Sequence, residues 1–414
     1  MKQGWEVRKL GDVCDLQNGF AFKSNDYIEF SNTINFRMSQ IRPDGGIDLE
    51  NNPKYLPDDY AVKYKNYLLK EGDVVIAMTD LATETKILGV PTIVPKDTRN
   101  WLLNQRVGKL LNIDYSMIEV AYLKYILTSS SVNEYYKSLG RGGLQINIGK
   151  QDILNAQIPL PPLPEQQRIV AILDEAFAAI AQAKANAEQN LKNAKELFES
   201  YLQSVFENKG EGWEEKTLGE VCKVERGSSP RPIDKYFTNE DDGVNWIKIG
   251  DTKGVDRYIY TTKQKITKEG ALKSRLVEVD DFILSNSMSF GKPYIMKTQG
   301  YIHDGWFVLR LPKDIDTEFF WYLLASPYTM NQFISLAAGA IVKNISGDLV
   351  KRTVLPIPPL KEQQIIVQKL DALSTETKQL ESIYQQKIND LDELKKSILQ
   401  KAFAGELNTT ALEV

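Results

Sequence analysis

Histidine and cysteine are scarce in this chain. Its 414 residues include one histidine, His303, and two cysteines, Cys14 and Cys222. A Ser-His-Asp triad and a metal site built from several histidines are therefore nearly excluded. The cysteines occupy equivalent positions in two similar segments, GWEVRKLGDVC from Gly4 and GWEEKTLGEVC from Gly212. We therefore expect duplicated small core residues rather than a disulfide or a metal pair.

Long apolar runs are also missing. No run approaches the roughly 20 apolar residues that span a bilayer, and the opening MKQGWEVRKL lacks the apolar core of a signal peptide. We therefore expect a cytoplasmic protein. There is no basic excess either, because 51 Lys and Arg stand against 55 Asp and Glu, for a net charge of −4. A nearly neutral domain can still carry one basic face, so the bulk charge decides little.

The common nucleotide and cofactor motifs are absent from the sequence. The segment SFGKP at 289–293 lacks the spacing of a Walker A loop, and no glycine-rich strand-to-helix fingerprint occurs. The segment Asn52-Pro53-Lys54-Tyr55 faintly resembles the Asn-Pro-Pro-aromatic loop of adenine methyltransferases, but it lacks the second proline. An ordinary surface turn explains it better. We therefore expect no catalytic residue, metal or cofactor in this chain.

What the chain does contain is an internal repeat. Residues 159–174 read PLPPLPEQQRIVAILD, and residues 356–371 read PIPPLKEQQIIVQKLD. The match continues without a gap to Phe206 and Phe403. A scaffold that is repeated while the sequence between the repeats diverges is suited to presenting two different surfaces in one frame.

Each repeated segment predicts a long helix. Proline tolerates the start of a helix, so the two helices should begin near Pro164 and Lys361. Neither helix contains glycine or proline until Gly210 and Gly405, and apolar residues recur at spacings of three and four. This periodicity predicts a coiled-coil seam. Roughly 42 residues at about 1.5 Å each give a rod on the order of 60 Å long.

The short connection after the first helix predicts the topology. The six residues from Glu207 to Gly212 reach at most about 20 Å, which is far short of the rod. The second divergent region should therefore sit at the far end of the first helix, and the second helix should run back. We predict two antiparallel helices, a domain at each end and a pseudo-twofold internal repeat.

The divergent regions themselves read as mixed α/β domains. Short β-like runs such as DVVIAM, PTIVP, DFILS and WFVLRL are separated by Gly, Asp, Asn and Pro turns, and aromatic helices begin near Ala121 and Phe319. We therefore predict an α+β fold in four segments. They are a first domain at 1–158, a helix at 159–210, a second domain at 211–355, and a second helix with a C-terminal tail at 356–414.

Both domains contain loop residues that suit contact with DNA, because Arg, Lys, Asn, Gln, Ser and Thr side chains can reach base edges or phosphates. In the first domain the candidates are Lys23, Ser24, Arg37, Gln40, Arg42, Thr79, Lys86, Gln105, Arg106, Arg141 and Gln145. In the second they are Arg226, Ser228, Arg231, Lys248, Asn286, Ser289, Lys292, His303, Lys343 and Asn344. Glycines that flank Arg141 and Lys343 in the sequence would let the backbone approach a phosphate closely.

The helix openings, the helix ends and the Trp…Leu-Gly segments from Trp5 and Trp213 together resemble the specificity subunit of a Type I restriction–modification enzyme. The resemblance covers essentially the whole chain. It implies two target-recognition domains that each read half of a split DNA sequence, spaced by two helices. The chain itself would be non-catalytic.

The same resemblance implies partner subunits. The helices would dock two methyltransferase (modification) subunits, and restriction subunits would complete the nuclease. S-adenosylmethionine, ATP and Mg²⁺ would belong to those partners. The repeated Glu-Gln-Gln openings are the candidates for partner binding, namely Glu165, Gln166, Gln167, Glu362, Gln363 and Gln364.

Two other functions stay open at this point. A coiled-coil scaffold that binds only proteins would explain the helices but not two divergent domains, and it would bind no DNA at any salt concentration. A methyltransferase with a fused recognition domain would bind S-adenosylmethionine as the isolated chain. A DNA-binding subunit would instead show salt-dependent binding to duplex DNA together with its partner.

Overall fold

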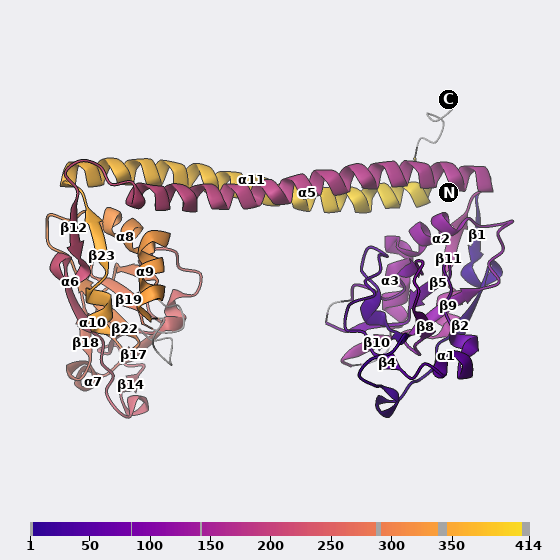
Figure 1. The fold of residues 1–414 in the computed structure, drawn as a ribbon, viewed down its shortest axis with the longest axis horizontal. Coiled ribbons are helices and arrows are strands. Elements are labelled where there is room, and N and C mark those ends of the chain that lie inside the picture. The colour runs from indigo at the N-terminus through magenta and orange to yellow at the C-terminus, as the bar shows by residue number, and fades with distance from the viewer. Residues whose placement is uncertain (1–2, 84, 141–142, 287–290, 338–345, 408–414) are drawn as a thin grey trace. The chain divides into compact units, whose positions relative to one another are not determined.

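The computed structural model of the chain describes residues 3–83, 85–140, 143–286, 291–337 and 346–407. It divides into two compact units (Figure 1). Unit 1 is formed by Met1–Asn186 together with Lys387–Val414, and unit 2 is Ala187–Gln386. Two 45-residue helices, α5 (Leu163–Glu207) and α11 (Leu360–Ala404), each contribute one part to unit 1 and the other part to unit 2.

Unit 1 is built on small mixed sheets. In its described part, a four-stranded antiparallel sheet has the order β2 (Asp15–Asn18), β9 (Val107–Leu111), β5 (Val74–Ala77) and β7 (Pro91–Ile93). A three-stranded sheet contains β4 (Tyr55–Leu56), β3 (Thr33–Phe36) and β8 (Asn100–Leu103), with β3 parallel to β8. The strand β6 (Thr79–Leu81) pairs with β10 (Gln145–Asn147). The helices are α1 (Tyr60–Lys63), α2 (Val120–Leu127), α3 (Ser130–Leu139) and α4 (Lys150–Leu154).

Unit 2 has larger sheets. Within its described residues, one sheet has the order β13 (Lys223–Arg226), β22 (Trp306–Arg310), β19 (Phe282–Ser285), β20 (Pro293–Met296) and β16 (Tyr258–Ile259). The other has the order β14 (Phe237–Thr238), β17 (Gln264–Ile266), β15 (Val244–Ile247), β21 (Gly300–Ile302) and β18 (Arg275–Val277). Its helices are α6 (Leu218–Val221), α7 (Lys268–Leu272), α8 (Thr317–Ala325), α9 (Pro327–Ala337) and α10 (Gly347–Lys351).

The two repeated sequence segments meet in each unit. In unit 1, β1 (Glu6–Lys9) pairs antiparallel with β11 (Gln157–Leu160), the strand just before α5. In unit 2, β12 (Glu214–Thr217) pairs in the same way with β23 (Val354–Ile357), just before α11. The first strand of each domain therefore pairs with the last strand of the same domain, just before the long helix begins. This pairing explains why both segments are repeated together.

In each unit, parts of both long helices pack on the aromatic helix of the domain. The core of unit 1 joins Leu173 of α5 and Phe403 of α11, and the ring of Phe403 lies 5.5 Å from that of Tyr122 in α2. The core of unit 2 joins Phe206 of α5 and Leu370 of α11, and Phe206 lies 5.8 Å from Phe319 in α8.

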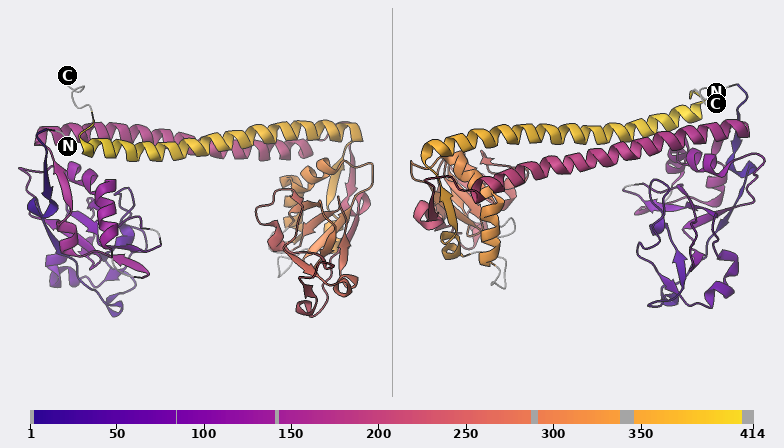
Figure 2. Two further views of the ribbon diagram at one scale, coloured as in Figure 1. Left: turned by 180° about the vertical axis from the view of Figure 1, so that it is seen from behind. Right: turned by 45° about the horizontal axis from the view of Figure 1, so that its top comes forward.

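The direction of the helices follows from these contacts. The start of α5 lies beside the end of α11 in unit 1, and the end of α5 lies beside the start of α11 in unit 2, so the pair runs antiparallel as predicted. In Figures 1 and 2, α2 and α8 each lie between the long helices and the sheets of their own unit. The predicted helix starts and the α+β class are confirmed. None of the described helices combines the length and apolarity needed to cross a bilayer.

The strand and cysteine predictions also hold. The four β-like runs form β5, β7, β19 and β22. Cys14 and Cys222 are buried free thiols, and their Sγ atoms donate to the carbonyls of Leu10 and Leu218 at 3.4 and 3.5 Å. They are the duplicated core residues that the repeat indicated.

Candidate nucleic-acid interface

The predicted DNA-contacting residues of unit 1 follow strand ends that meet at one end of its sheets. The register pairs Asn18 with Gly108 and Ala77 with Val107, so β2 and β5 finish where β9 begins. Strand β3 finishes there too, because Phe36 pairs with Leu103 at the end of β8. We call the segments 19–27, 37–42, 78–83, 85–88 and 104–106 the polar end of unit 1. Candidates far apart in the sequence are therefore brought together.

Unit 2 has an equivalent end. Ser285 at the end of β19 pairs with Trp306 at the start of β22, which also pairs through Phe307 with Arg226 at the end of β13. Ile247 at the end of β15 pairs with Ile302. We call the segments 227–236, 248–252, 286, 291–292 and 303–305 the polar end of unit 2.

One turn at each polar end has the same backbone framework. The amide of Gly19 donates to the carbonyl oxygen of Val107 at 3.2 Å. A Cβ atom added to Gly19 would lie 2.1 Å from the carbonyl oxygen of Asn104. In unit 2 the amide of Gly227 donates to Trp306 at 2.8 Å, and an added Cβ would lie 2.0 Å from the carbonyl oxygen of His303. Only glycine fits such a close backbone approach.

The side chain that opens each turn accepts a hydrogen bond from the amide two residues later. In unit 1, Asn104 Oδ1 accepts from Arg106 N at 3.1 Å. In unit 2, His303 Nδ1 accepts from Gly305 N at 2.9 Å. The turn 104–106 therefore presents Asn, Gln and Arg where the turn 303–305 presents His, Asp and Gly. The two polar ends share a scaffold and differ in their chemistry.

The candidates of unit 1 divide by exposure. Those exposed to solvent are Lys23, Ser24, Lys86 and Gln105, and those half-buried are Arg37, Arg42, Arg106 and Gln145. Arg42 forms an ion pair with Asp48. Arg37 Nη1 is buried and has no hydrogen-bond partner within the described residues. A buried guanidinium nitrogen without a partner is uncommon, because buried polar groups are normally hydrogen-bonded.

Two candidates of unit 1 are buried. Gln40 is fully buried, its Oε1 accepts from Arg37 N at 2.7 Å and its Nε2 donates to Asn51 O at 2.8 Å. Thr79 Oγ1 donates to Asn147 Oδ1 at 2.7 Å, which fixes β10 against β6. Both buried side chains therefore stabilise the backbone of the polar end through hydrogen bonds.

In unit 2 the candidates gather around Asp304. Its carbonyl oxygen accepts from Arg226 Nε at 3.2 Å and from Asn286 Nδ2 at 2.8 Å. Its carboxylate accepts from Ser229 Oγ at 2.8 Å and lies 3.6 Å from Arg231. The hydrogen bond from Ser229 lowers the pKa of Asp304, which keeps it ionised.

The remaining candidates of unit 2 lie on the surrounding loops. Ser228 Oγ donates to Lys273 O at 3.1 Å, and Lys292 Nζ donates to Val255 O at 3.2 Å. Lys248 is exposed, and its Nζ lies 6.0 Å from the ring of Phe237. Four candidates of the two domains lie outside the described residues, namely Arg141, Ser289, Lys343 and Asn344. Among the described residues, no cluster of three or more His, Cys, Asp or Glu could hold a metal ion.

The Glu-Gln-Gln openings of the long helices contain buried middle glutamines. Gln166 Oε1 accepts from Glu119 N at 2.9 Å, while its Nε2 donates to the carbonyls of Met117 and Pro161, both at 2.8 Å. Gln363 Oε1 accepts from Asp316 N at 2.8 Å, and its Nε2 donates to Pro358 O at 2.9 Å. Glu119 and Asp316 are the N-cap residues of α2 and α8. Each glutamine therefore ties a long helix to the aromatic helix of its domain.

The other members of these openings differ in exposure. Gln167 and Gln364 are exposed, and Glu165 is half-buried. Glu362 Oε1 accepts from Trp213 Nε1 at 2.8 Å. The surface that a partner could reach at each helix opening therefore contains the third residue of the motif rather than the second.

Sequence reasoning missed a second tie between each domain and its helix. Tyr125 of α2 donates to Asp174 of α5, and Tyr322 of α8 donates to Asp371 of α11 at 2.6 Å. Burial raises the pKa of Tyr322 to about 12. The repeat contained the signal, because both tyrosines and both aspartates occupy equivalent positions.

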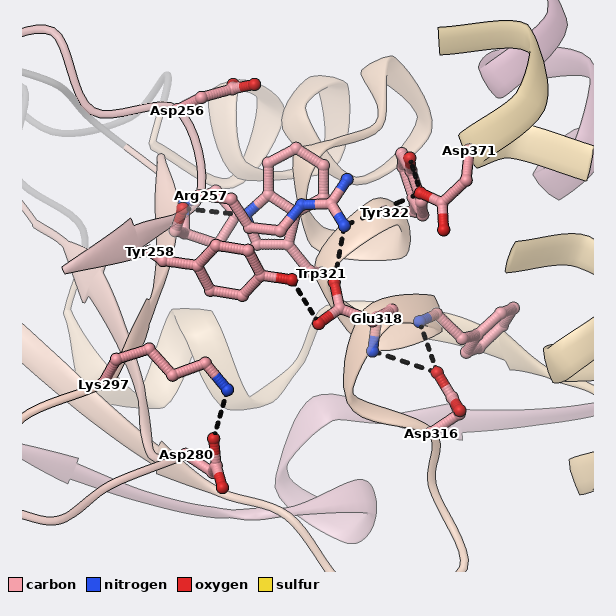
Figure 3. A network of polar contacts seen from close by, with 12 residues as sticks. Asp256, Arg257, Tyr258, Asp280, Lys297, Asp316, Glu318, Trp321, Tyr322 and Asp371 are labelled. Carbon is pink, nitrogen blue, oxygen red and sulfur yellow. Dashed lines mark hydrogen bonds and ion pairs between the residues drawn. The ribbon is translucent and has the colours of Figure 1, made fainter. Parts of the chain in front are cut away.

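Unit 2 adds a third tie, centred on Arg257 (Figure 3). The guanidinium lies 4.0 Å from the ring of Trp321 and 4.6 Å from that of Tyr322, and its Nη1 lies 2.5 Å from Glu318 Oε2. Tyr258 also donates to Glu318, at 2.6 Å. Stacking and ion pairing together fix the loop before β16 against α8.

Comparison with known proteins places the repeat in a family. A model of the type I restriction modification DNA specificity domain matches residues 2–193 and again residues 210–390. The chain is 26% identical, over 98% of its length and 94% of the relative, to the putative type I restriction enzyme MjaX specificity subunit of Methanocaldococcus jannaschii.

Solved structures share the fold. The HsdS subunit from Thermoanaerobacter tengcongensis matches with a TM-score of 0.61 and 23% identity, covering 98% of both chains. A chain from a structure described as the basis of complex assembly and conformational transition of the type I R-M system matches with a TM-score of 0.76. Its identity is 22%, and the match covers 98% of this chain and 99% of that one.

Proposed function

The chain belongs to the family of type I restriction modification DNA specificity domains, and from this premise we propose that it is the specificity subunit of a type I restriction–modification complex. The target-recognition domains are residues 1–158 and 211–355, with the helical segments 159–210 and 356–414 between and after them. The observation that carries this proposal is the pair of polar ends. One backbone framework is used twice and presents different side chains each time.

Each polar end contacts one half of a split DNA target in this account. The side chains available are Arg, Lys, Asn, Gln, Ser and His, which suit base edges and phosphates. Because the turns 104–106 and 303–305 differ, the two half-sites should differ as well. A palindromic target would contradict this part of the proposal.

The two long helices set the spacing between the half-sites in this proposal. The support is their length of 45 residues each and their continuity from one unit into the next. Deleting one heptad from both helices should shorten the unread spacer or abolish binding, because about 10 Å of helix is removed. Mapping of methylated sites would contradict the idea if the spacer stayed unchanged.

The partners are two methyltransferase (modification) subunits, which dock along the helices near the exposed Gln167 and Gln364. Restriction subunits complete the nuclease. The chain itself is non-catalytic, and S-adenosylmethionine, ATP and Mg²⁺ serve the partner subunits. We place the complex in the cytoplasm.

The decisive experiment maps methylated adenines across the genome of cells that express this chain with its methyltransferase partner. We expect one asymmetric motif in two parts separated by a spacer of fixed length. Cells with the partner alone are the control and should lack that motif. If the motif is absent when both proteins are present and folded, a scaffold without DNA readout becomes the better description.

A further inference from the structure

The polar end of unit 2 contains a cavity of about 490 Å³ whose lining holds three strong hydrogen-bond donors together with the carboxylates of Asp234 and Asp304. Arg231, Lys248 and His303 contribute side chains to it, and Trp246 and Phe237 supply aromatic walls. The side chain of Arg231 is 82% exposed, so its guanidinium is free to turn toward a ligand.

His303 is held as a donor by the turn that it opens. Its Nδ1 accepts from Gly305 N at 2.9 Å, so the proton of the neutral ring lies on Nε2. Burial lowers the pKa of His303, and Lys248 lowers it further, while Asp304 acts in the opposite direction. The ring therefore offers one N–H group of fixed tautomer.

Two carboxylates line the cavity, and of these Asp234 is exposed to solvent while Asp304 is engaged. The carboxylate of Asp304 accepts from Ser229 Oγ at 2.8 Å and lies 3.6 Å from Arg231. The donors that line the cavity are the imidazole N–H of His303, the ammonium of Lys248 and the guanidinium of Arg231, which is 82% exposed and can leave its 3.6 Å ion pair with Asp304. Such a set favours a ligand edge that presents two acceptors side by side.

In the major groove of DNA, only guanine presents two adjacent acceptors, O6 and N7, on one base. Adenine places an amino group next to N7, and that group would meet the donors of the cavity unfavourably. We propose that the cavity formed by Arg231, Lys248 and His303 reads a guanine in the half-site of unit 2. This inference rests on the proposed function and assigns one base to one site.

Unit 1 provides the matched control. Asn104 opens the equivalent turn and uses its Oδ1 for the bond to Arg106 N. The variant His303→Asn should therefore keep the turn, since asparagine supports it in unit 1, while the donor of the imidazole is lost. Arg231→Gln is a second variant at an exposed position whose effect on folding should be small.

The experiment uses the complete complex with its methyltransferase partner and duplexes that carry the mapped target. Guanine in the half-site of unit 2 is replaced by 7-deazaguanine, which lacks the N7 acceptor. We expect the wild-type complex to methylate the modified duplex about tenfold more slowly, because a good contact to a base edge gives roughly this discrimination. His303→Asn or Arg231→Gln should reduce this difference, and Asn104→His should leave it intact.

Three results would overturn the assignment. One is a half-site of unit 2 without guanine. Another is equal sensitivity to 7-deazaguanine in wild type and both variants. The third is that the His303→Asn and Arg231→Gln variants bind all DNA sequences equally more weakly and with a smaller salt dependence. This result would indicate that the two side chains contact phosphates. A wild-type complex that methylates no bipartite target would instead refute the proposed function.

Discussion

Units 1 and 2 attach their domains to the long helices through equivalent residues, but their solvent-facing polar ends differ in sequence. In both, a buried glutamine caps the aromatic helix and a tyrosine donates to an aspartate of the long helix. In both, an aromatic ring from the far end of the other long helix fills the core. The polar ends keep only the backbone of one turn. The repeat therefore specifies how each domain is held, and the loops specify what it contacts.

The units also differ in how firmly the domain is held. Trp321 of unit 2 stacks on Arg257, whereas the repeat places Lys124 at the equivalent position of unit 1. There, a cavity of about 720 Å³ is lined by Lys124, Tyr125 and Phe177 among others. The equivalent cavity of unit 2, lined by Trp321 and Phe198 among others, is smaller, at about 370 Å³.

The largest expected effect concerns the shared aromatic contact. Phe206→Ala should destabilise unit 2 by about 4 kcal/mol, because Phe206 is fully buried and its loss leaves a cavity against Phe319. Phe403→Ala in unit 1 should cost less, about 3 kcal/mol, since Phe403 retains 9% exposure. Hydrogen exchange measured by mass spectrometry should locate each loss in its own unit. Equal loosening of both units by either variant would contradict this division.

The next effect concerns the buried glutamines. Gln166→Ala should lower the free energy of unfolding by about 3 kcal/mol, since it removes three hydrogen bonds and leaves buried groups unpaired. Gln363→Ala removes two and should cost about 2 kcal/mol. Urea unfolding measures both, with the exposed Gln167→Ala as the control at below about 0.5 kcal/mol. A control as harmful as Gln166→Ala would mean that the motif acts through another contact.

The third effect tests the tie of unit 2 that is centred on Arg257. Arg257→Ala should cost about 2 kcal/mol, because the guanidinium is mostly buried between two rings and its loss leaves Glu318 with the hydrogen bond from Tyr258 but without its ion pair. Lys184→Ala in unit 1 breaks a more exposed ion pair with Asp392 and should cost less than about 1 kcal/mol. Thermal unfolding of both variants gives the comparison. Similar costs would remove the proposed difference between the junctions.

The smallest effect should be equal in the two units. Burial raises the pKa of both Cys14 and Cys222 from 9.0 to about 12. The stability that this provides is complete below pH 9 and is lost as the pH rises toward 12, because the unfolded thiol ionises first. At pH 8 both thiols should react with iodoacetamide much more slowly in the folded chain than in guanidinium, because less of each is present as thiolate. A fast thiol in only one unit would show that the two core positions are not equivalent.

The scaffold was predictable from sequence because repetition exposes it. Two copies of the Pro-rich opening fixed both helix starts, and six linker residues fixed the antiparallel direction. Gln166 was predicted as a candidate for partner binding, and nothing in the sequence indicated that its side chain is buried and accepts from the amide that begins α2. A glutamine between a proline and an apolar segment can be buried or exposed, and the sequence alone does not distinguish the two.

The polar ends were harder to predict. Lys23, Gln105 and Arg231 were named for their chemistry, but their gathering at one end of each unit depends on strand register, which loops of unequal length conceal. Arg257 escaped notice because its partners Glu318 and Trp321 lie some 60 residues away and have no counterpart in the repeat. Comparing the two repeats cannot reveal a contact that is made in one unit by residues without equivalents in the other.

The most direct test of the central claim is site-specific cross-linking to the mapped target. A photoreactive amino acid would replace Gln105 in one complex and Arg231 in another, with Glu188 on α5 as the control position. We predict that position 105 cross-links to bases of one half-site, position 231 to bases of the other, and position 188 to neither. Cross-links from 105 and 231 to the same half-site would contradict the account.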